Sequence, residues 1–247
     1  MRIAAIIPAR YASTRFPGKP LALINGKSMI MRVYEQVLRA KGITLVAVAT
    51  DDSRIYNHIV DQGGHVVMTA ESHTSGTSRC EEAMRILSSR ETLDAVINVQ
   101  GDEPFIHPEQ ITQVASLLHS GNVQIASLCK KISSEAELLN PNVVKVVMNA
   151  SGHAMYFSRH PVPYVRNSYT HEANPDVEHF RHIGIYGYLT EALMRIVSLP
   201  EVMSEKSEML EQLRWLHFGY PIRMGITDLE SEAVDSPDDL LKFMNKA

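Results

Sequence analysis

Three cations stand within ten positions near the start of the chain, in the segment IIPARYASTRFPGKP at residues 6–20. Arg10, Arg15 and Lys19 alternate there with small residues, and a Pro-Gly pair interrupts any regular element. Small side chains let the backbone approach a ligand closely, and guanidinium and ammonium groups pair with phosphate oxygens. The pattern indicates a polyphosphate-binding loop, although the same residues are also common in a solvated surface loop.

A second polar group follows an apolar run, in the segment NVQGDEP at residues 98–104. Asp102 and Glu103 come just after a predicted strand, Gly101 permits a sharp turn, and Pro104 stops further strand pairing. A carboxylate at the end of a strand, facing a cationic loop, is the ligand that a phosphate-bridging Mg²⁺ needs. Taken alone, these residues favour an ordinary turn. Taken with the cationic loop, they favour a site for Mg²⁺ and a polyphosphate.

Two familiar phosphate-binding motifs do not account for the cations. The sequence NGKS at residues 25–28 resembles the end of a P-loop, but Leu21 stands where that motif requires its first glycine. No G-x-G-x-x-G fingerprint follows a predicted strand, which argues against a dinucleotide fold of the dehydrogenase type. Phosphates at this site would therefore be held largely by side chains.

The composition is that of an ordinary globular protein. Of the 247 residues, 45% are hydrophobic and 21% are charged, which is enough apolar material for a full core. The net charge of −4 makes the basic loop a local feature and argues against nucleic-acid binding. The first apolar run is too short for a signal peptide, and no run approaches the roughly 20 residues of a membrane span. Cys80 and Cys129 fit no metal-ligand spacing and predict buried thiols, so we expect a cytoplasmic protein without membrane insertion.

Apolar runs and helical patterns alternate over the first hundred residues. Each predicted strand is almost wholly apolar, so both of its faces must be covered. Strands are expected at residues 2–8, 44–52, 65–69 and 94–99, and helices at 29–42, 53–64 and 77–90. These elements predict an α/β fold with a mostly parallel sheet and helices on either side. Ligands of such a sheet bind beyond the carboxyl ends of its strands, where the loop with Arg10 leaves the first strand.

The pattern changes after residue 130. The segments NVVKVVMN, HAMYFSRHPVPYV and HIGIYGYLT predict antiparallel or mixed strands around a polar stretch at 161–181. We interpret them as a mixed-sheet excursion over about 130–190. No segment has the composition of a linker, so we expect a single domain over residues 1–247.

A series of short motifs is more specific. From residue 6 to about 240 the sequence contains, in order, IIPARYASTRFPGKPL, ATDD, SGTSR, NVQGDEP, NPNVVKVV, YFSR, RHIGIYGY, EMLEQLR and VDSPDDL. In this order they resemble the 3-deoxy-manno-octulosonate cytidylyltransferase family, which makes a CMP-activated sugar for lipopolysaccharide. The resemblance implies a Rossmann-like nucleotidyltransferase sheet, the substrates CTP and an eight-carbon sugar acid, and a Mg²⁺ cofactor. It also implies a homodimer with a sugar-binding and dimerisation lobe at about 130–190.

The resemblance also assigns roles to residues. The family's triphosphate-binding loop is matched by Arg10, Arg15 and Lys19, and its Mg²⁺-binding aspartates by Asp102 and Asp235. The sugar-acid pocket is matched by Gln100, Arg159, His182, Tyr186, Glu211 and Gln212. In the implied reaction the anomeric hydroxyl of the sugar acid attacks the α-phosphate of CTP and pyrophosphate leaves. The residues assigned to catalysis are Arg10, Arg15, Lys19 and Asp102.

Helical spacing bears on one of these residues independently. A helix is expected in SEKSEMLEQLRWLHFG, with Met209, Leu213 and Leu216 in an inward stripe and Glu211 pointing away from it. Spacing alone favours a solvated position for Glu211. The same holds for His182 and Tyr186 of RHIGIYGY, which on spacing alone are polar core residues with a satisfied hydrogen bond.

The sequence departs from the family pattern at several positions. Ser78 stands where an acidic residue is usual, His160 and Val165 replace an alanine and an aspartate, and a glycine before VDSPDDL is absent. The first three bear on the sugar side, so the acid with an 8-hydroxyl group and its 8-amino-8-deoxy form both remain open. Two alternatives are a non-catalytic nucleotide-binding relative, although none of the matched cations and aspartates is missing, and another CMP-sugar-acid synthetase such as the sialic-acid-activating enzyme.

Overall fold

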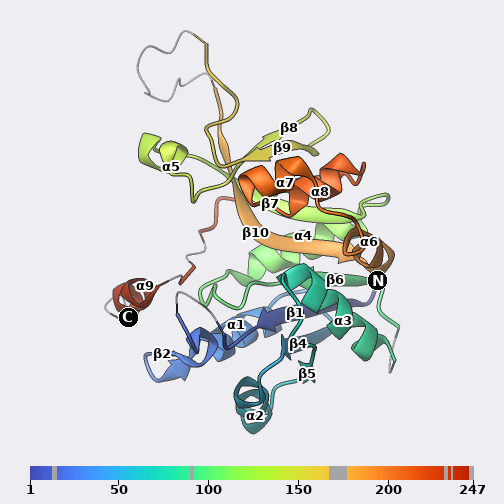
Figure 1. The fold of residues 1–247 in the computed structure, drawn as a ribbon, viewed down its shortest axis with the longest axis vertical. Helices are drawn as coiled ribbons and strands as arrows, with labels where there is room; N and C mark the ends of the chain where they lie inside the picture. Colours follow the sequence, from blue (N-terminus) through green and yellow to red (C-terminus); the bar gives the residue numbers. More distant parts are fainter. Residues whose placement is uncertain (13–15, 90–91, 167–176, 231–232, 235, 245–247) are drawn as a thin grey trace.

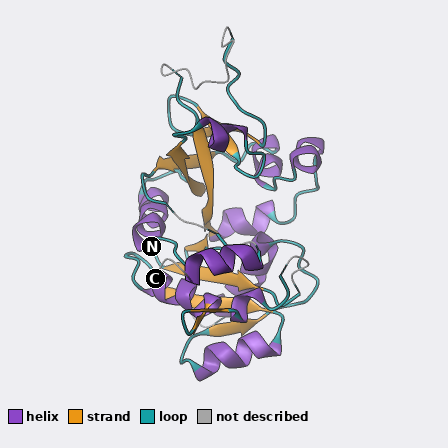
Figure 2. Cartoon of the chain, turned by 90° about the vertical axis from the view of Figure 1, so that its left-hand side faces the viewer, coloured by secondary structure: helices purple, strands orange, loops and turns teal. Residues whose placement is uncertain are grey.

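The computed structural model describes residues 1–12, 16–89, 92–166, 177–230, 233–234 and 236–244, and for residues 241–244 it describes the backbone alone. Helices flank a central sheet (Figures 1 and 2). The strands are β1 (Ile3–Ala9), β2 (Leu23–Ile24), β3 (Lys27–Ser28), β4 (Leu45–Thr50), β5 (Val66–Met68), β6 (Ala95–Asn98), β7 (Ile125–Lys131), β8 (Lys145–Met148), β9 (Ala154–Ser158), β10 (Phe180–Leu189) and β11 (Ile222–Ile226). The helices are the short 3-10 helix η1 (Lys19–Leu21), α1 (Met29–Leu38), α2 (Ser53–Asp61), α3 (Gly76–Ser88), α4 (Pro108–His119), α5 (Glu135–Leu139), α6 (Thr190–Ile196), α7 (Met203–Glu208), α8 (Gln212–His217) and α9 (Pro237–Met244).

The main path of the sheet has the strand order β11-β7-β10-β6-β1-β4-β5. β1 pairs in parallel with β4 and β6, β4 with β5, and β7 with β11. β10 lies between β6 and β7 and runs antiparallel to both. The predicted α/β class with a mostly parallel sheet is therefore confirmed.

Both faces of the sheet are covered, which explains why its strands are so apolar. On β1, Ile3, Ala5 and Ile7 face one buried cluster, which includes residues of α1 and α4. Ala4 and Ile6 face a second cluster, which includes residues of α3, α6 and α8. Alternate side chains of one strand thus belong to two cores, as the period of a β-strand requires.

The predicted excursion after residue 130 is a hairpin of β8 and β9 joined to the first part of β10. Lys145 of β8 pairs with Ser158 of β9 and with Arg181 of β10, and both pairings are antiparallel. Figure 1 shows β10 running from this upper hairpin into the main sheet below. β10 is therefore the element that continues from the mixed upper part into the parallel lower part, and the predicted mixed-sheet excursion is confirmed.

The helix predicted across SEKSEMLEQLRWLHFG is divided in two. α7 ends at Glu208, the backbone of the following Met209 adopts the left-handed conformation with φ of 53°, and α8 begins only at Gln212. Met209 is 77% exposed whereas Leu213 is 3% exposed, so the predicted inward stripe through Met209 was wrong. The prediction assumed one continuous helix. Because the chain changes direction at residue 209, Met209 and Leu213 do not share one face of a helix.

The two cysteines are free and buried, as predicted. Burial raises the pKa of the Cys129 thiol to about 12 and raises the pKa of the Cys80 thiol as well, so both are neutral thiols. Over the part of the chain that the structure describes, every helix is too short or too polar to cross a membrane.

Candidate active site

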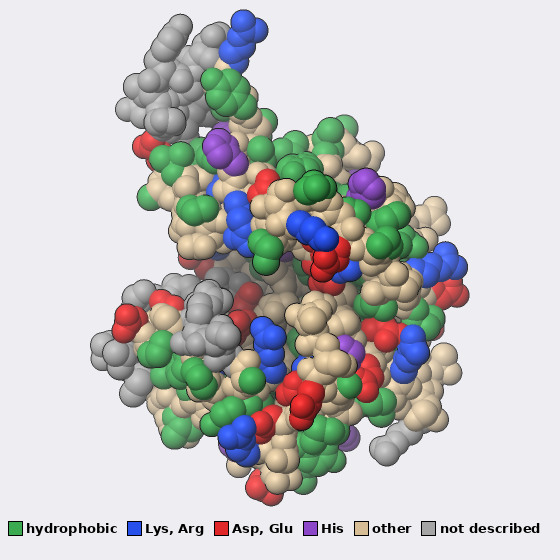
Figure 3. Space-filling model, in the orientation of Figure 1, with side chains coloured by type: hydrophobic (Ala, Val, Ile, Leu, Met, Phe, Trp, Pro, Cys, Tyr) green, Lys and Arg blue, Asp and Glu red, His purple; other side chains and the backbone are tan. Residues whose placement is uncertain are grey.

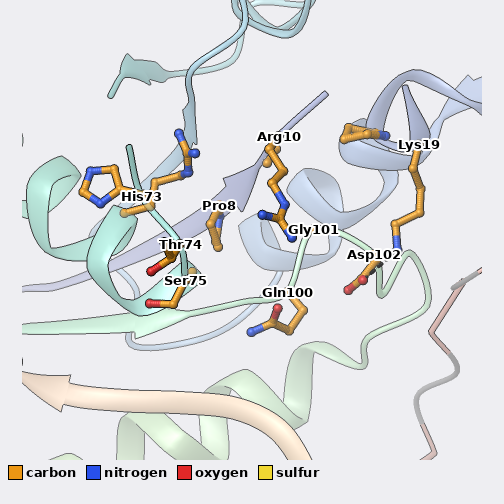
Figure 4. Close-up of a pocket in the computed structure, with 13 residues that line it drawn as sticks. Pro8, Arg10, Lys19, His73, Thr74, Ser75, Gln100, Gly101 and Asp102 are labelled. Carbon is orange, nitrogen blue, oxygen red and sulfur yellow. Dashed lines mark hydrogen bonds and ion pairs between the residues drawn. The ribbon is translucent and has the colours of Figure 1, made fainter. Parts of the chain in front are cut away.

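Four of the predicted site residues meet at one edge of the sheet. β1 and β6 run parallel, so Arg10 after β1 and Gln100 and Asp102 after β6 lie at the same end. Together with Lys19 they line a cavity of about 210 Å³ (Figure 4). The surface of the molecule is hollowed between its lower and upper parts (Figure 3). This is the position at which open α/β sheets bind ligands.

Gly101 brings the QGD turn against the end of β1. A Cβ atom on Gly101 would lie 2.8 Å from the carbonyl oxygen of Pro8, closer than a carbon and an oxygen can approach without displacement. A Cβ on Gly76, the first residue of α3, would lie 3.2 Å from the Pro8 ring. Two glycines therefore let the turn and the start of α3 close around the end of β1.

Lys19 joins three distant segments at the cavity wall. Its Nζ atom lies 2.7 Å from Asp102 Oδ2 and donates to the carbonyl oxygen of Val234 at 2.8 Å. The backbone N–H of Val234 donates to the carbonyl oxygen of Asp102 at 2.9 Å. Arg15 and Asp235 lie outside the described residues, so the roles predicted for them stay predictions.

Asp102 fits part of a magnesium site. Mg²⁺ prefers hard oxygen ligands and is usually held by one or two carboxylates together with substrate phosphates and water. The Asp102 side chain is 31% exposed beside the cavity. Among the described residues there is no cluster of three or more His, Cys, Asp or Glu side chains that could hold a metal alone. The donor set therefore suits an ion that a bound polyphosphate helps to hold.

The start of α3 forms the facing wall and is bonded to α8. Ser75 caps the helix, because its Oγ accepts from the backbone N–H of Ser78. The Glu211 carboxylate accepts from Ser75 Oγ at 3.2 Å, from Thr77 Oγ1 at 2.7 Å and from the Arg214 guanidinium at 3.0 Å. Glu211 therefore does not have the solvated position that spacing alone allowed. It joins the upper part of the molecule to the wall of the cavity.

The departure at Ser78 is accommodated by a histidine. His73 Nδ1 lies 3.0 Å from Ser78 Oγ, and His73 Nε2 contacts the carboxylate of Glu82. The Glu82 carboxylate also accepts from the backbone N–H of Ala70, and these two contacts lower its pKa below the usual range. A carboxylate, an imidazole and a hydroxyl thus form one chain beside the cavity that His73 lines. Sequence reasoning did not predict this chain, whose only signal was the unusual serine.

Arg79 is a buried cation in the cavity wall that sequence reasoning also missed. Its guanidinium lies 2.5 Å from Asp51 Oδ2 and donates to Thr69 Oγ1 at 2.7 Å. The residue is 3% exposed, so Asp51 neutralises most of its charge before any ligand is present. Asp51 follows β4 and Thr69 follows β5, so Arg79 fixes α3 to the ends of two strands.

The predicted sugar residues of β10 lie in an aromatic cluster. His182 Nε2 is 2.9 Å from Ser127 Oγ, and burial lowers the pKa of His182 to about 3, so its ring is neutral. The ring centroid of Tyr186 lies 5.1 Å from that of His182 and 5.0 Å from that of Trp215. Burial, and then the charge of Glu211, raises the pKa of Tyr186 well above its usual value. The Tyr186 hydroxyl has no hydrogen-bond partner among the described residues, which points to a ligand or a water there.

The six predicted sugar residues do not share one cavity. Gln100 lines the 210 Å³ cavity, whereas His182 lines a neighbouring cavity of about 340 Å³. Gln212 is 5% exposed. The Arg159 guanidinium lies at the end of β9 and donates to backbone carbonyl oxygens. Their shared role in sugar binding stays a prediction.

Comparison with solved structures places the fold and the site in a known class. The chain is 40% identical to CMP:2-keto-3-deoxy-manno-octonic acid synthetase complexed with CTP, with a TM-score of 0.91 over 100% of this chain and 98% of that one. A 4-diphosphocytidyl-2C-methyl-D-erythritol synthase from Anaerococcus prevotii shares only the fold, at 14% identity and a TM-score of 0.63 over 99% of this chain and 95% of that one. Fold and site thus define a nucleotidyltransferase enzyme of the α/β type.

Sequence comparison is more specific. A profile described as cytidylyltransferase matches residues 4–222. The 3-deoxy-manno-octulosonate cytidylyltransferase of Parabacteroides distasonis is 50% identical, with 99% of this chain and 97% of that protein covered. The 8-amino-3,8-dideoxy-manno-octulosonate cytidylyltransferase of Shewanella pealeana is 45% identical, with 97% and 96% covered. The chain belongs to the 3-deoxy-manno-octulosonate cytidylyltransferase family, as its motifs predicted.

Proposed function

We propose that this protein transfers the cytidylyl group of CTP to 3-deoxy-manno-octulosonate, giving the CMP-activated sugar and pyrophosphate for lipopolysaccharide synthesis. The observation that carries the proposal is the cavity at the carboxyl edge of the sheet, where Arg10, Lys19 and Asp102 face the start of α3. A synthetase that is 40% identical was solved with CTP. Both substrates are anionic, and a cavity with cations and helix N–H groups suits them.

The residues of this chain supply binding and charge, and need form no covalent bond. Arg10 and Lys19 lie on the side where the β- and γ-phosphates would be held, and their charge would stabilise the leaving pyrophosphate. Arg15 of the same loop is proposed for the same task from its sequence alone. When bound, Mg²⁺ would neutralise charge on the phosphates and lower the pKa of the attacking hydroxyl. Asp102 would hold it, with Asp235 as the second carboxylate that the sequence predicts.

The acceptor would lie toward the upper part of the molecule. Gln212 begins α8 and Glu211 directly precedes it, and the hydroxyl of Tyr186 on β10 has no hydrogen-bond partner within the described residues. These groups could pair with the hydroxyls of a sugar acid. The neutral ring of His182 would pair as an uncharged imidazole, so it would not add to the charge that binds the sugar carboxylate.

A second candidate substrate is the 8-amino-8-deoxy form of the same acid. It is favoured by the relative from Shewanella pealeana, which is named for that sugar and is 45% identical. Ser78, which departs from the usual acidic residue beside the cavity and is bonded to His73, leaves both forms of the acid open. One or two polar contacts, worth about 1 to 3 kcal/mol each, would decide between a hydroxyl and an ammonium at carbon 8.

Pyrophosphate release tests the proposal. The purified protein would be assayed with CTP, Mg²⁺ and each of three acceptors: the 8-hydroxyl acid, the 8-amino acid and a nine-carbon sialic acid. We expect turnover with the first two and little with the third, and the ratio of their kcat/KM values assigns the sugar. Preference for the sialic acid would overturn the assignment of the pocket. Binding of CTP without turnover of any acceptor would favour the non-catalytic alternative.

Oligomeric state and location are further proposals. The resemblance implies a homodimer, and the upper part of the molecule exposes large apolar side chains that a partner could cover, namely Met155, Tyr156, Tyr164, Met203 and Met209. Light scattering would then give a mass twice the 27.6 kDa of the chain. Free buried thiols at Cys80 and Cys129 suit the reducing cytoplasm that we propose as its location.

A further inference from the structure

Lys145 is a fully buried cation that makes no ion pair in the described part of the chain. Its Nζ atom donates to the backbone carbonyl oxygens of Asn140 at 2.8 Å, Val143 at 2.8 Å and Arg159 at 2.7 Å. The residue is 0% exposed. An ammonium group has three N–H donors, and each of them is used. Burial, followed by the charge of Arg159, lowers the pKa of Lys145 from its usual value.

The three carbonyl groups belong to two segments, which lie next to the paired strands β8 and β9. Asn140 and Val143 flank the loop between α5 and β8, and Arg159 directly follows β9. The same loop is bonded a second time, because Arg159 Nη1 donates to the Pro141 carbonyl oxygen at 3.1 Å. Removing Lys145 would therefore take one donor from each of these three carbonyls, of which the Asn140 carbonyl keeps the Val143 N–H as a partner while those of Val143 and Arg159 belong to half-buried residues.

From Arg159 the bonding continues to the turn between α7 and α8. The backbone N–H of Arg159 donates to the Glu208 carboxylate at 2.8 Å. Its Nε atom donates to the Glu208 carbonyl oxygen at 2.7 Å and its Nη2 atom to that of Met209 at 3.4 Å. Two residues further along the chain is Glu211, which reaches the start of α3 at the cavity wall. Hydrogen bonds thus lead from Lys145 through Arg159 to Met209, and two further residues of the chain lead to Glu211.

This placement distinguishes Lys145 from both a catalytic and a merely stabilising lysine. Its three donors are occupied by backbone carbonyls, and it lines neither of the two cavities near the site, so it does not touch substrate. The nucleotide side of the site is held separately, by Lys19, Asp102 and Val234 on other segments. A change at Lys145 should therefore act on the two substrates unequally.

We infer that Lys145 is a positioning residue for the sugar-acid half of the site. It holds the Arg159 backbone and the 140–143 loop in the arrangement from which Arg159 fixes the α7–α8 turn, and that turn carries Glu211 and Gln212. This inference rests on the proposed function, because it takes the second substrate to be a sugar acid bound on that side. If the inference holds, Lys145 contacts neither substrate and yet helps to set the affinity for the sugar acid.

Steady-state kinetics of K145M tests the inference, because methionine has a similar length and no donor. We expect the KM for the sugar acid to rise by about ten- to hundredfold, since a small displacement of binding groups has effects of this size. The KM for CTP should stay within about twofold, as should the CTP concentration that half-saturates the rise in melting temperature. Amide hydrogen exchange at residues 208–212 should become faster. K131M is the matched control, because Lys131 is an exposed lysine whose partner is the exposed Glu178.

Each outcome is decisive. Equal increases in both KM values, or unchanged kinetics in K145M, would overturn the inference. If K145M does not fold, K145Q keeps two of the donors and should show the same unequal change in smaller measure, while equal changes in K145Q would count against the inference. If the wild-type protein turns over no sugar acid, the proposed function fails in the wild type itself. Exchange at residues 208–212 then still tests the positioning role, which unchanged rates would overturn.

Discussion

At the scale of single residues, Asp102 has two partners that compete for its carboxylate, Lys19 in this structure and Mg²⁺ in the proposed reaction. We expect D102N to lower kcat by about a hundredfold or more, because an amide is a poor ligand for Mg²⁺ and several kcal/mol of charge stabilisation would be lost. Stability should change little, since the ion pair is partly exposed. Turnover at saturating Mg²⁺ measures the effect. D52N is the control, since Asp52 caps α2 near the same edge and asparagine also caps well. Near-normal turnover of D102N would remove Asp102 from the metal site.

His182 gives the protein a pH dependence of stability with a defined sign. Its pKa in the folded protein is about 3 against 6.5 for the free side chain, because burial disfavours the charged ring. Between these values the unfolded chain binds one more proton, so this group lowers the free energy of unfolding by about 1.4 kcal/mol for each unit of falling pH. Above about pH 7 it has no effect.

Urea denaturation of H182Q at several pH values measures this contribution. Below pH 6.5 the free energy of unfolding should fall less steeply with falling pH in H182Q than in the wild type. The two slopes should differ by the contribution of one bound proton, about 1.4 kcal/mol per pH unit. H65Q, at an exposed position, serves as the control. Parallel pH profiles for H182Q and the wild type would show that His182 is protonated in the folded protein.

Sequence reasoning worked best for residues that directly follow strands. Arg10 and Asp102 could be placed together because parallel strands end at one edge of a sheet. It could not place Thr77 beside Glu211 or Lys19 beside Val234, because these contacts join residues far apart in the chain and leave no periodic pattern. Lys145 escaped notice for a different reason. In NVVKVV it interrupts an apolar strand as a surface lysine would, and only the structure reveals the carbonyls that it bonds.

At the scale of elements, the QGD turn depends on the absence of a side chain at Gly101. We expect G101A to lower the free energy of unfolding by about 1 to 3 kcal/mol, because a Cβ 2.8 Å from the Pro8 carbonyl oxygen must push the turn away from β1. The same displacement moves Asp102, so kcat should fall as well. Thermal denaturation and pyrophosphate release measure the two effects. G121A should be neutral, since a Cβ there meets no atom within 4 Å. Equal behaviour of the two variants would contradict the close approach.

The turn between α7 and α8 allows a pair of substitutions with opposite expected signs. Met209 is exposed and left-handed, so M209G should raise the free energy of unfolding by about 1 kcal/mol by relieving backbone strain. Met203 is equally exposed but begins α7, so M203G should lower it by up to about 1 kcal/mol. Urea denaturation measures both. Destabilisation of M209G would show that the Met209 side chain holds this turn. The break itself could not be predicted, because methionine gives no glycine or proline signal.

At the scale of the whole molecule, the segment after β11 returns to the far side of the cavity. Val234 is 0% exposed and packs in a small cluster with Ile24 and Met29, and its backbone bonds both Asp102 and Lys19. We expect a chain ending at residue 228 to keep the main sheet, whose last strand ends at Ile226, and to lose nearly all turnover. Circular dichroism and pyrophosphate release measure these properties. A chain ending at residue 244 is the control. Normal turnover of the shorter chain would show that the returning segment does not complete the site.

The placement of β10 constrains how the chain is made. This strand begins at Phe180, more than eighty residues after β6 ends at Asn98. It nevertheless lies beside β6, between β6 and β7. A ribosome adds roughly 5 to 20 residues per second, so β10 would be synthesised about 5 to 20 seconds after β6. Until then the edge of β6 that pairs with β10 stays unpaired. During that interval a nascent chain exposes an apolar strand edge, which invites pairing with other chains. Chaperone demand during translation should therefore be greatest after β6 has emerged and should fall once residue 189 has left the exit tunnel.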